Sequence, residues 1–312
     1  MFGKNVANYH KKRKMMKKIS LVILTYNSEN DIYNCLDSVY QHNDIGDGLE
    51  VIIVDNNSTN YAEMHDNIRS LYPDVKIIAN NRNGGYGQGN NVGIRATSSP
   101  IVAIMNPDVR LVMPTFRLIY DTLQKQDIIM CGGKQYINEG KEGTSFFCDY
   151  HCHPLYQSIM YSHYRRHDIF KPKYMWLSGA FFAIKKDYFE KIGLFDETIF
   201  MYGEEYDIHM RLQKLLPTKT VQYIKELKYI HLIEDRIYTK DSYIKPYTSI
   251  YHVCKKHNLS IEKVFENLIW VCRIQFAMAY ILRLLNRPYD PKAHEKINMF
   301  KDLFKHILQT NQ

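Results

Sequence analysis

The sequence predicts an α/β fold, and three observations lead to that prediction. Short apolar runs alternate, in the first third of the chain, with stretches whose apolar residues recur at helical spacing. Polar residues follow the end of each of the first four apolar runs. The chain has 312 residues, of which 45% are hydrophobic and 24% charged, so it can form one or two domains with substantial cores.

The first part of the chain gives the expected elements in a regular order. Ile32, Leu36 and Val39 lie on one face of the first expected helix. A glycine-rich turn and a further helix follow the third strand. Strands that alternate with helices predict a parallel sheet, with ligands at the carboxyl ends of its strands. The expected strands are 19–24, 49–55, 75–79 and 100–105, and the first two helices are 29–40 and 61–71.

The later part of the chain is less regular. It is expected to contain long loops with short strands (132–173), a strand-like run (176–184), an acidic helix, and two further strand-like pieces (220–224 and 227–232). From Asp241 onward the chain is mainly helical in pattern. The predicted organisation is a basic tail (1–18), an α/β domain (19–240) and a helical region (241–312).

Two acidic sites suggest a chemistry. Glu204 and Glu205 open the acidic helix, and Asp108 closes an Asn-Pro-Asp turn after the fourth strand. Acids in a first helical turn also suit the helix dipole, and Asp207 with Arg211 forms an ordinary i,i+4 pair. Both acidic sites together are typical of metal-assisted transfer from a phosphate donor to a hydroxyl.

Asp108 is a candidate ligand for Mg²⁺ or Mn²⁺, because these hard cations prefer carboxylate and diphosphate oxygens. The alternative is a turn residue after Pro107. His231 follows a strand and is a candidate further contact to metal or phosphate, although a single histidine among thirteen is usually structural. A metal at this site would neutralise charge on a departing diphosphate.

Polar residues after the first three strands are candidate nucleotide contacts. Asp55 can accept a hydrogen bond from a base N–H, or it can form an Asx turn or helix cap with Ser58 and Thr59. The glycine-rich segment 81–93 matches neither a phosphate-binding loop ending in G-K-[ST] nor the G-x-G-x-x-G dinucleotide pattern. Its glycines either allow close approach of a nucleotide or sugar, or form a plain flexible turn.

Charge and cysteine content narrow the class of protein. The net charge is +8, and a basic segment lies at 11–18, which is usually a solvated terminus. No nucleic-acid-binding module is recognisable, so no nucleic-acid partner is expected. The six cysteines form no C-x-x-C pair, and free thiols in a reducing cytoplasm are expected. One crowded group does not match the spacing of a structural zinc site, namely Cys148, His151, Cys152 and His153.

The order of motifs resembles the family 2 inverting glycosyltransferases of the GT-A fold, and most of all the rhamnosyltransferase-like subgroup of bacterial polysaccharide synthesis. The similar region spans about 20–257. It contains, in order, LVILTYNSE, VIIVDNNST, NGGYGQGNNVG, MNPD, WLSGAFFAI, FDETIFMYGEEYD and YIH. The resemblance implies a Rossmann-like mixed sheet flanked by helices, with a helical C-terminal extension.

The resemblance also implies roles for particular residues. Nucleotide and donor contacts are implied for Thr25, Tyr26, Asn27, Asp55, Asn83, Gly84, Asn90 and Asn106. Contacts to the acceptor are implied for Trp176, Ser178 and Gly179. Asp108 corresponds to the metal-binding acid of a DXD-type motif, and His231 to a histidine near the metal. The acidic pair of the family maps to Glu204 and Glu205, with Glu205 as the catalytic base.

Three positions depart from the family pattern. Asn106 replaces the first acid of DXD, Tyr86 replaces the usual Phe of the glycine-rich loop, and Glu205 replaces the usual Asp of the acidic pair. Glu205 is one methylene longer than Asp, so the choice of base between Glu204 and Glu205 stays open.

The implied activity is metal-dependent transfer of a sugar from a UDP- or dTDP-sugar to a hydroxyl of a saccharide or lipid-linked saccharide, with inversion. The cofactor would be Mg²⁺ or Mn²⁺. A non-catalytic sugar-nucleotide-binding protein would need no acids at 204–205. A nucleotidyltransferase of the same fold would need a glycine-rich basic loop after the first strand, where this chain has TYNSEN.

An apolar face at 261–285 has two explanations. Trp270, Phe276 and Leu282 lie on it, while Arg273, Gln275 and Arg283 interrupt it, so no membrane span is expected there. Acceptors linked to lipid, together with the basic start and Arg287, suggest peripheral contact of a cytoplasmic protein with the inner face of the plasma membrane. The alternative is a core helix or the seam of a homodimer.

Overall fold

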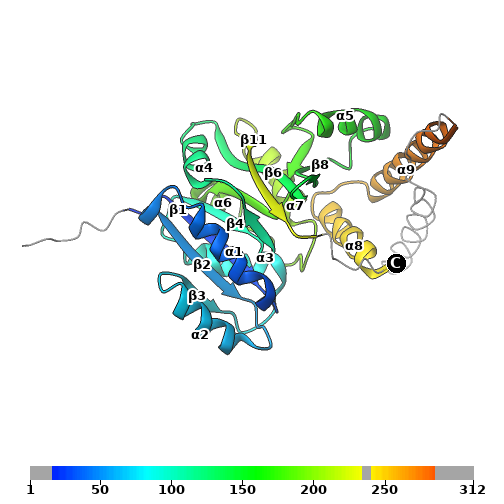
Figure 1. The fold of residues 1–312 in the computed structure, drawn as a ribbon. Coiled ribbons are helices and arrows are strands. Elements are labelled where there is room, and N and C mark those ends of the chain that lie inside the picture. Colours follow the sequence, from blue (N-terminus) through cyan, green and yellow to red (C-terminus); the bar gives the residue numbers. More distant parts are fainter. Residues whose placement is uncertain (1–15, 234–239, 285–312) are drawn as a thin grey trace, which may run out of the picture.

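The computed structural model describes residues 16–233 and 240–284, and a nine-stranded sheet lies at its centre (Figure 1). The strands of this sheet are β1 (Ile19–Thr25), β2 (Leu49–Asp55), β3 (Lys76–Ala79), β4 (Ile101–Met105), β5 (Val109–Leu111), β6 (Ile128–Asn138), β7 (Lys141–Glu142), β10 (Phe181–Lys185) and β11 (Thr220–His231). Their order is β3-β2-β1-β4-β10-β6-β11-β5, and β7 pairs with β6.

The prediction of a parallel sheet is correct for the first four strands. β1 pairs in parallel with β2 and with β4, and β2 pairs in parallel with β3. The later strands make the sheet mixed, because β10 is antiparallel to β4 and β6, and β5 is antiparallel to β11. This confirms the mixed α/β architecture that the resemblance implied.

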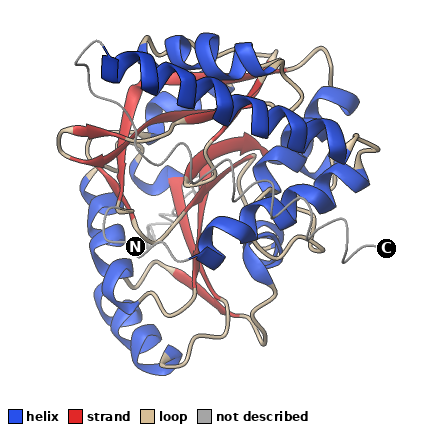
Figure 2. Ribbon diagram, turned by 90° about the vertical axis from the view of Figure 1, so that its right-hand side faces the viewer, coloured by secondary structure: helices blue, strands red, loops and turns tan. Residues whose placement is uncertain are grey.

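Helices cover both faces of the sheet, as Figure 2 shows with helices in blue and strands in red. One core contains side chains from α1 (Glu29–Gln41), α2 (Tyr61–Leu71) and α4 (Phe116–Leu123). A second core, on the other face, contains side chains from α3 (Gly85–Arg95), α6 (Lys186–Lys191) and α7 (Glu204–Leu215). Alternate residues of β1 serve these two cores: Leu21 and Ile23 pack in the first, and Val22 in the second.

Segment 176–184 forms two strands instead of the single strand expected. β9 (Met175–Leu177) pairs with β8 (Phe146–Cys148) in a separate two-stranded sheet, and β10 belongs to the main sheet. Residues 178–180 break the run between them. The sequence does not reveal this break, because the residues on both sides of it are apolar, as expected for a buried strand of either sheet. The break places Ser178 and Gly179 in a loop.

Two further expectations need correction. The pieces 220–224 and 227–232 are one strand, β11, with a register shift between Ile224 and Lys228. Region 132–173 begins inside β6 and also contains a π-helical turn (Tyr156–Met160) and α5 (Tyr161–Arg166), so it is not mainly loop. Gly133 lies within β6, and glycine is needed there because a Cβ would come within 2.2 Å of Leu227.

Within the described part of the predicted helical region 241–312, the structure has two helices, α8 (Lys240–Lys256) and α9 (Ile261–Leu284). Val253 of α8 packs against Trp176 and Tyr206, which ties this region to the α/β domain. Trp270 of α9 is exposed. Within residues 16–233 and 240–284, no helix is long and apolar enough to cross a membrane. Residues 1–15, Arg287 and the side chains of Leu282 and Arg283 lie outside the described part of the chain.

Candidate active site

A cavity of about 460 Å³ lies where the loops after β1, β3 and β4 meet the start of α7. Ligands were expected at the carboxyl ends of these strands. Its lining includes many of the residues singled out from the sequence, namely Tyr26, Asn83, Asn106, Asp108, Ser178, Gly179, Glu204, Glu205 and His231.

Glu204 and Glu205 begin α7, next to two residues with left-handed backbone. Tyr202 has φ 69° and Gly203 has φ 92°. Such a conformation is costly for a tyrosine and common only at sites where the surrounding structure enforces it. Here it turns the chain so that both carboxyl groups line the cavity from the first turn of the helix.

The two carboxyl groups differ in environment. Burial, followed by the Glu205 charge, raises the pKa of Glu204 well above its usual range. Burial also raises the pKa of Glu205, but backbone N–H groups of Glu205 and Gly179 stabilise its charged form. Oε1 of Glu204 has no hydrogen-bond partner within the described part of the chain. Backbone N–H groups of Glu204 and Tyr202 also stabilise the charged form of Glu204, so what distinguishes it is the nearby Glu205 charge, which favours its protonated form.

Gly179 holds the Glu205 carboxylate against the backbone. A Cβ at this position would lie 2.0 Å from Oε1 of Glu205, so only glycine leaves room for the carboxylate. The carbonyl of Gly179 accepts a hydrogen bond of 2.8 Å from the Tyr86 hydroxyl. Burial, followed by the charges of Glu205, Glu204 and Asp108, raises the pKa of Tyr86 well above its usual range.

We predict that Gly179→Ala lowers the transfer rate about a hundredfold while nucleotide binding persists. The added methyl group would displace the Glu205 carboxylate, and misplacement by about 1 Å can cost about 10²-fold. Initial rates and nucleotide-induced thermal shifts would measure both effects. Gly140→Ala is the matched control, since a Cβ there meets nothing within 4 Å. Equal rates for the two variants would contradict the prediction.

Asp108 and His231 come together where β5 and β11 pair. His231 is the register partner of Val109, and its Nε2 lies 3.2 Å from Oδ1 of Asp108. Neighbouring ligand atoms on one octahedral cation lie about 3 Å apart, because each metal–oxygen distance is about 2.1 Å. The spacing therefore allows both atoms to contact one cation, and it also allows a direct ion pair between them. Of the two side chains, the Asp108 carboxylate has the chemistry that Mg²⁺ or Mn²⁺ prefers. No group of three metal-binding side chains occurs within 16–233 and 240–284, so substrate oxygens would have to complete the shell.

The glycine-rich segment turns into a helix, as expected, and its residues from Gly85 onward form most of α3. Gly85 has φ 88°, and a Cβ there would lie 2.1 Å from the carbonyl oxygen of Phe200. Asn83 Oδ1 accepts hydrogen bonds from the Gly85 N–H (3.1 Å) and from the Asn56 amide (2.9 Å). Asn83 and Gly85 line the cavity, so the N-terminus of α3 lies beside it, and a helix N-terminus favours phosphate.

Several predicted contacts do not line the cavity. Asp55 is 1% exposed, and its carboxylate accepts from the Ser58 N–H at 3.2 Å and from the Thr25 hydroxyl at 3.3 Å. These contacts match the turn interpretation of Asp55. Asn27 accepts from the Thr59 N–H at 2.9 Å, which joins the loops after β1 and β2. The predicted residues outside the lining are Thr25, Asn27, Asp55, Gly84, Asn90 and Trp176.

Other lining residues were not predicted from the sequence. Tyr86 was noted only as a departure from the family pattern, and no motif singled out Phe147 or Tyr202. The sequence gives no signal for Phe147, because Phe146, Phe147 and Cys148 are all apolar and only the structure shows that Phe147 alone is exposed. The unpredicted residues in the lining are Leu24, Ser28, Asp31, Asn56, Gly85, Tyr86, Phe147, Ala180, Met201 and Tyr202.

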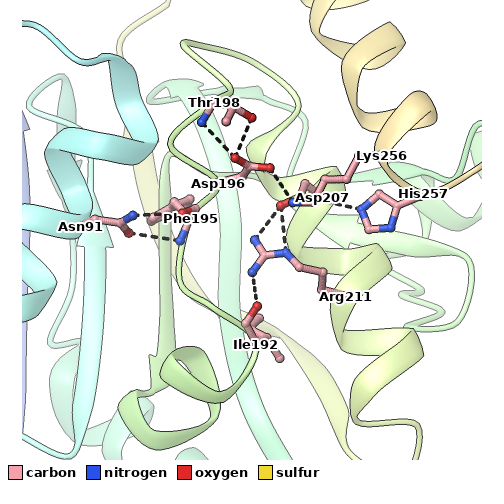
Figure 3. Close-up of polar contacts among 9 residues, drawn as sticks. All are labelled: Asn91, Ile192, Phe195, Asp196, Thr198, Asp207, Arg211, Lys256 and His257. Carbon is pink, nitrogen blue, oxygen red and sulfur yellow. Dashed lines mark hydrogen bonds and ion pairs between the residues drawn. The ribbon is translucent and has the colours of Figure 1, made fainter.

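An ionic network around Asp207 of α7 follows the two glutamates in sequence (Figure 3). Asp207 is fully buried and accepts from Arg211 Nε at 2.9 Å and Nη2 at 2.6 Å. From the end of α8 and just beyond it, Lys256 Nζ lies 2.7 Å and His257 Nε2 2.8 Å from Asp207 Oδ1. Lys256 also contacts Asp196, at 2.6 Å. The Asp207 carboxylate thus joins α7 to the end of α8 and to His257. Lys256 extends this link to Asp196 in the loop before α7.

Comparison with known proteins places this geometry in a family. The profile of glycosyl transferase family 2 matches residues 20–193, which is more than half of the chain. The chain belongs to glycosyl transferase family 2. This confirms the resemblance at the level of the family and its GT-A fold; the rhamnosyltransferase-like subgroup stays a prediction.

Two relatives in this family are named for activities in glycan chemistry. The low-salt glycan biosynthesis hexosyltransferase Agl10 of Haloferax volcanii is 26% identical over 215 residues. Glycosyltransferase GlyG of Streptococcus pneumoniae is 24% identical over 134 residues. The matches cover 64% and 43% of this chain, and 63% and 44% of the relatives. The similarity therefore spans less than two thirds of each relative's length.

Solved structures share the fold of this family member at low sequence identity. The mannosyltransferase PcManGT from Pyrobaculum calidifontis, in complex with GDP-Man and Mn²⁺, has a TM-score of 0.59 and 15% identity, over 94% of this chain and 86% of that chain. GalNAc-T7 with UDP, GalNAc and Mn²⁺ also has a TM-score of 0.59, with 14% identity, over 93% of this chain and 55% of that chain.

Proposed function

We propose that this family member transfers a sugar from a nucleoside-diphosphate sugar to a hydroxyl of a saccharide or lipid-linked saccharide, in the synthesis of a polysaccharide or another glycan. The observation that carries the proposal is one cavity with two acidic sites. Asp108 and His231 line it as a pair of metal-ligand type, and buried Glu204 and half-buried Glu205 line it from α7.

The donor is proposed to bind with its diphosphate between the N-terminus of α3 and Asp108. Asn83, Gly85 and the exposed ring of Tyr26 line this part of the cavity. Asp108 and His231 would hold Mg²⁺ or Mn²⁺, which supplies positive charge next to the departing diphosphate. The ligands of the two structural neighbours, GDP-Man with Mn²⁺ in one and UDP with Mn²⁺ in the other, support a donor and cation of this class.

The proposed reaction is a single displacement with inversion. An acceptor oxygen forms a bond to the anomeric carbon while the bond from that carbon to the diphosphate oxygen breaks. Glu205 takes the proton of the acceptor hydroxyl, and the nucleoside diphosphate leaves with the bonding electrons. Attack comes from the face opposite the diphosphate, so the anomeric configuration inverts. No protein nucleophile is required.

The direct test offers UDP-, dTDP- and GDP-sugars to the protein, each with and without a saccharide acceptor. Acceptor-dependent release of nucleoside diphosphate, with a new glycosidic bond in the product, supports the proposal. Formation of a sugar nucleotide with release of pyrophosphate would assign a nucleotidyltransferase. Donor binding in a thermal-shift assay without any turnover would assign a binding protein. Dimer formation and contact with an anionic membrane surface stay predictions.

Removal of divalent metal is predicted to stop the reaction. EDTA should abolish transfer, and Mg²⁺ or Mn²⁺ should restore it. Asp108→Asn should lower the rate about a hundredfold or more at any metal concentration, since the cation supplies several kcal/mol at the transition state. Calorimetric titration of Mn²⁺ in the presence of UDP is an independent readout, in which Asp108→Asn should weaken binding. Full activity after exhaustive chelation would contradict this prediction.

A further inference from the structure

Phe147 is an aromatic side chain that β8 presents to the cavity. Its neighbours Phe146 and Cys148 are buried, whereas Phe147 is 39% exposed and lines the cavity together with Glu205. Single exposed apolar residues are common on protein surfaces and by themselves indicate nothing. Phe147 differs because it lies in a cavity beside a half-buried carboxylate and because a second aromatic ring supports it.

That second ring is Trp176, its register partner on β9. The two rings stack with centroids 5.9 Å apart and planes inclined by 22°. Trp176 is only 7% exposed, and its ring lies 5.2 Å from Tyr150 and 4.7 Å from Tyr206. The ring of Phe147 is therefore backed by a packed aromatic cluster.

The same cluster fixes Phe147 relative to the catalytic helix. Tyr206 directly follows Glu205 in α7, and its hydroxyl donates a 3.0 Å hydrogen bond to Asp149 in the loop after β8. Phe147 is thus connected to the residue after Glu205 through the rings of Trp176 and Tyr206. The hydrogen bond from Tyr206 to Asp149 adds a second link, to the loop after β8. A flat apolar surface at a fixed position beside a base suits the apolar C–H face of a pyranose ring.

We propose that Phe147 is the platform on which the acceptor sugar packs, so that one of its hydroxyls reaches Glu205. This inference rests on the proposed function and deepens it, because it specifies the acceptor as a saccharide whose ring has an exposed apolar face. Trp176, which the resemblance predicted at the acceptor site, supports the platform from below and does not line the cavity. Met201 and Tyr202 line the same cavity and supply further apolar surface there.

Kinetics of Phe147 variants test the platform. Phe147→Ala should raise the acceptor KM about tenfold or more, and much more than it raises the donor KM. Phe147→Tyr should restore the acceptor KM, whereas Phe147→Leu, which keeps apolar volume without an aromatic face, should not. Phe276→Ala is the matched control, because Phe276 is 42% exposed on α9 and lies outside the cavity lining.

A binding measurement separates failure of this inference from failure of the proposed function. The chain has two tryptophans, so Trp270→Phe leaves Trp176, directly behind Phe147, as the reporter. Its fluorescence would be titrated with methyl glycosides of glucose, mannose, galactose and N-acetylglucosamine in the presence of UDP or GDP. A saturable change that Phe147→Ala weakens about tenfold supports the platform.

Either of two results would overturn the inference. One is a Trp270→Phe protein in which no glycoside alters Trp176 emission. The other is a folded Phe147→Ala variant with unchanged glycoside affinity and an unchanged acceptor KM. A third outcome is that the protein binds glycosides in a saturable, Phe147-dependent way but transfers no sugar from any donor. This outcome would contradict the proposed transferase function and would support Phe147 as a saccharide-binding platform.

Discussion

Glu205→Gln is expected to lower the transfer rate by about 10²–10⁴-fold, the usual contribution of a positioned general base. The glutamine keeps the size of the side chain but cannot take the acceptor proton. Nucleotide binding should be nearly unchanged, because the proposed donor contacts lie at α3 and Asp108. Single-turnover rates with saturating donor, and thermal shifts with UDP or GDP, would measure the two effects separately.

The matched control is Glu204→Gln. Since burial and the Glu205 charge favour a protonated Glu204, this variant should keep most of the wild-type rate near neutral pH. If Glu204→Gln is inactive and Glu205→Gln is active, the base is Glu204. The wild-type pH profile gives a second check. The pKa of Glu205 is raised above 4.5, so kcat/KM should fall as the pH drops through a value above 4.5.

Asp207→Ala is expected to lower the free energy of unfolding by about 3–5 kcal/mol, the usual cost of removing one partner from a buried ion pair. Asp207 is fully buried, and its loss leaves Arg211, Lys256 and His257 without their shared anion. Urea denaturation at pH 7 would measure the change. Asp66→Ala is the control, because its pair with Arg69 is exposed and should contribute less than about 1 kcal/mol.

The pH dependence of this effect follows from the pKa of Asp207. Hydrogen bonds from His257, Lys256 and Arg211, with the charge of Arg211, lower it from 3.8 to about 2, despite burial. A lowered carboxyl pKa contributes stability that is present above the unfolded value and is lost as the pH falls toward the folded value. The wild type and Asp207→Ala should therefore converge in stability between about pH 4 and pH 2. A constant difference across this range would contradict the assignment.

Local sequence patterns predicted the elements whose apolar residues recur at a regular spacing within a short stretch of sequence. Helix α2 has the predicted bounds, and α7 begins at the acidic pair as expected, because helical spacing and acids in a first turn are visible in a short window. The break between β9 and β10 was missed, since apolar residues on both sides of Ser178-Gly179-Ala180 pack in different sheets. Period alone does not show which sheet a strand joins.

In the candidate site, too, residues within local motifs were predicted, whereas contacts between residues distant in sequence were not. Asp108 and Glu205 carry motif signals, and the structure brings both to one cavity. Trp176 was expected at the acceptor, but Tyr150 and Tyr206 cover it, and these contacts depend on a loop and a helix distant in sequence. The link from Asp207 to His257 spans 50 residues, so no local pattern could predict it. Contacts of this length arise only when the whole domain is folded.

Gly179 has a consequence for engineering the specificity of this enzyme. Its N–H holds the carboxylate of Glu205, while its carbonyl takes the hydroxyl of Tyr86 from the first turn of α3. In the proposed reaction, donor binding at α3 and proton removal from the acceptor therefore depend on the position of a single residue. Libraries that exchange Asn83 to Tyr86 for a new donor should also change turnover of the old acceptor. Donor and acceptor preferences would have to be selected together, with both substrates present in each round.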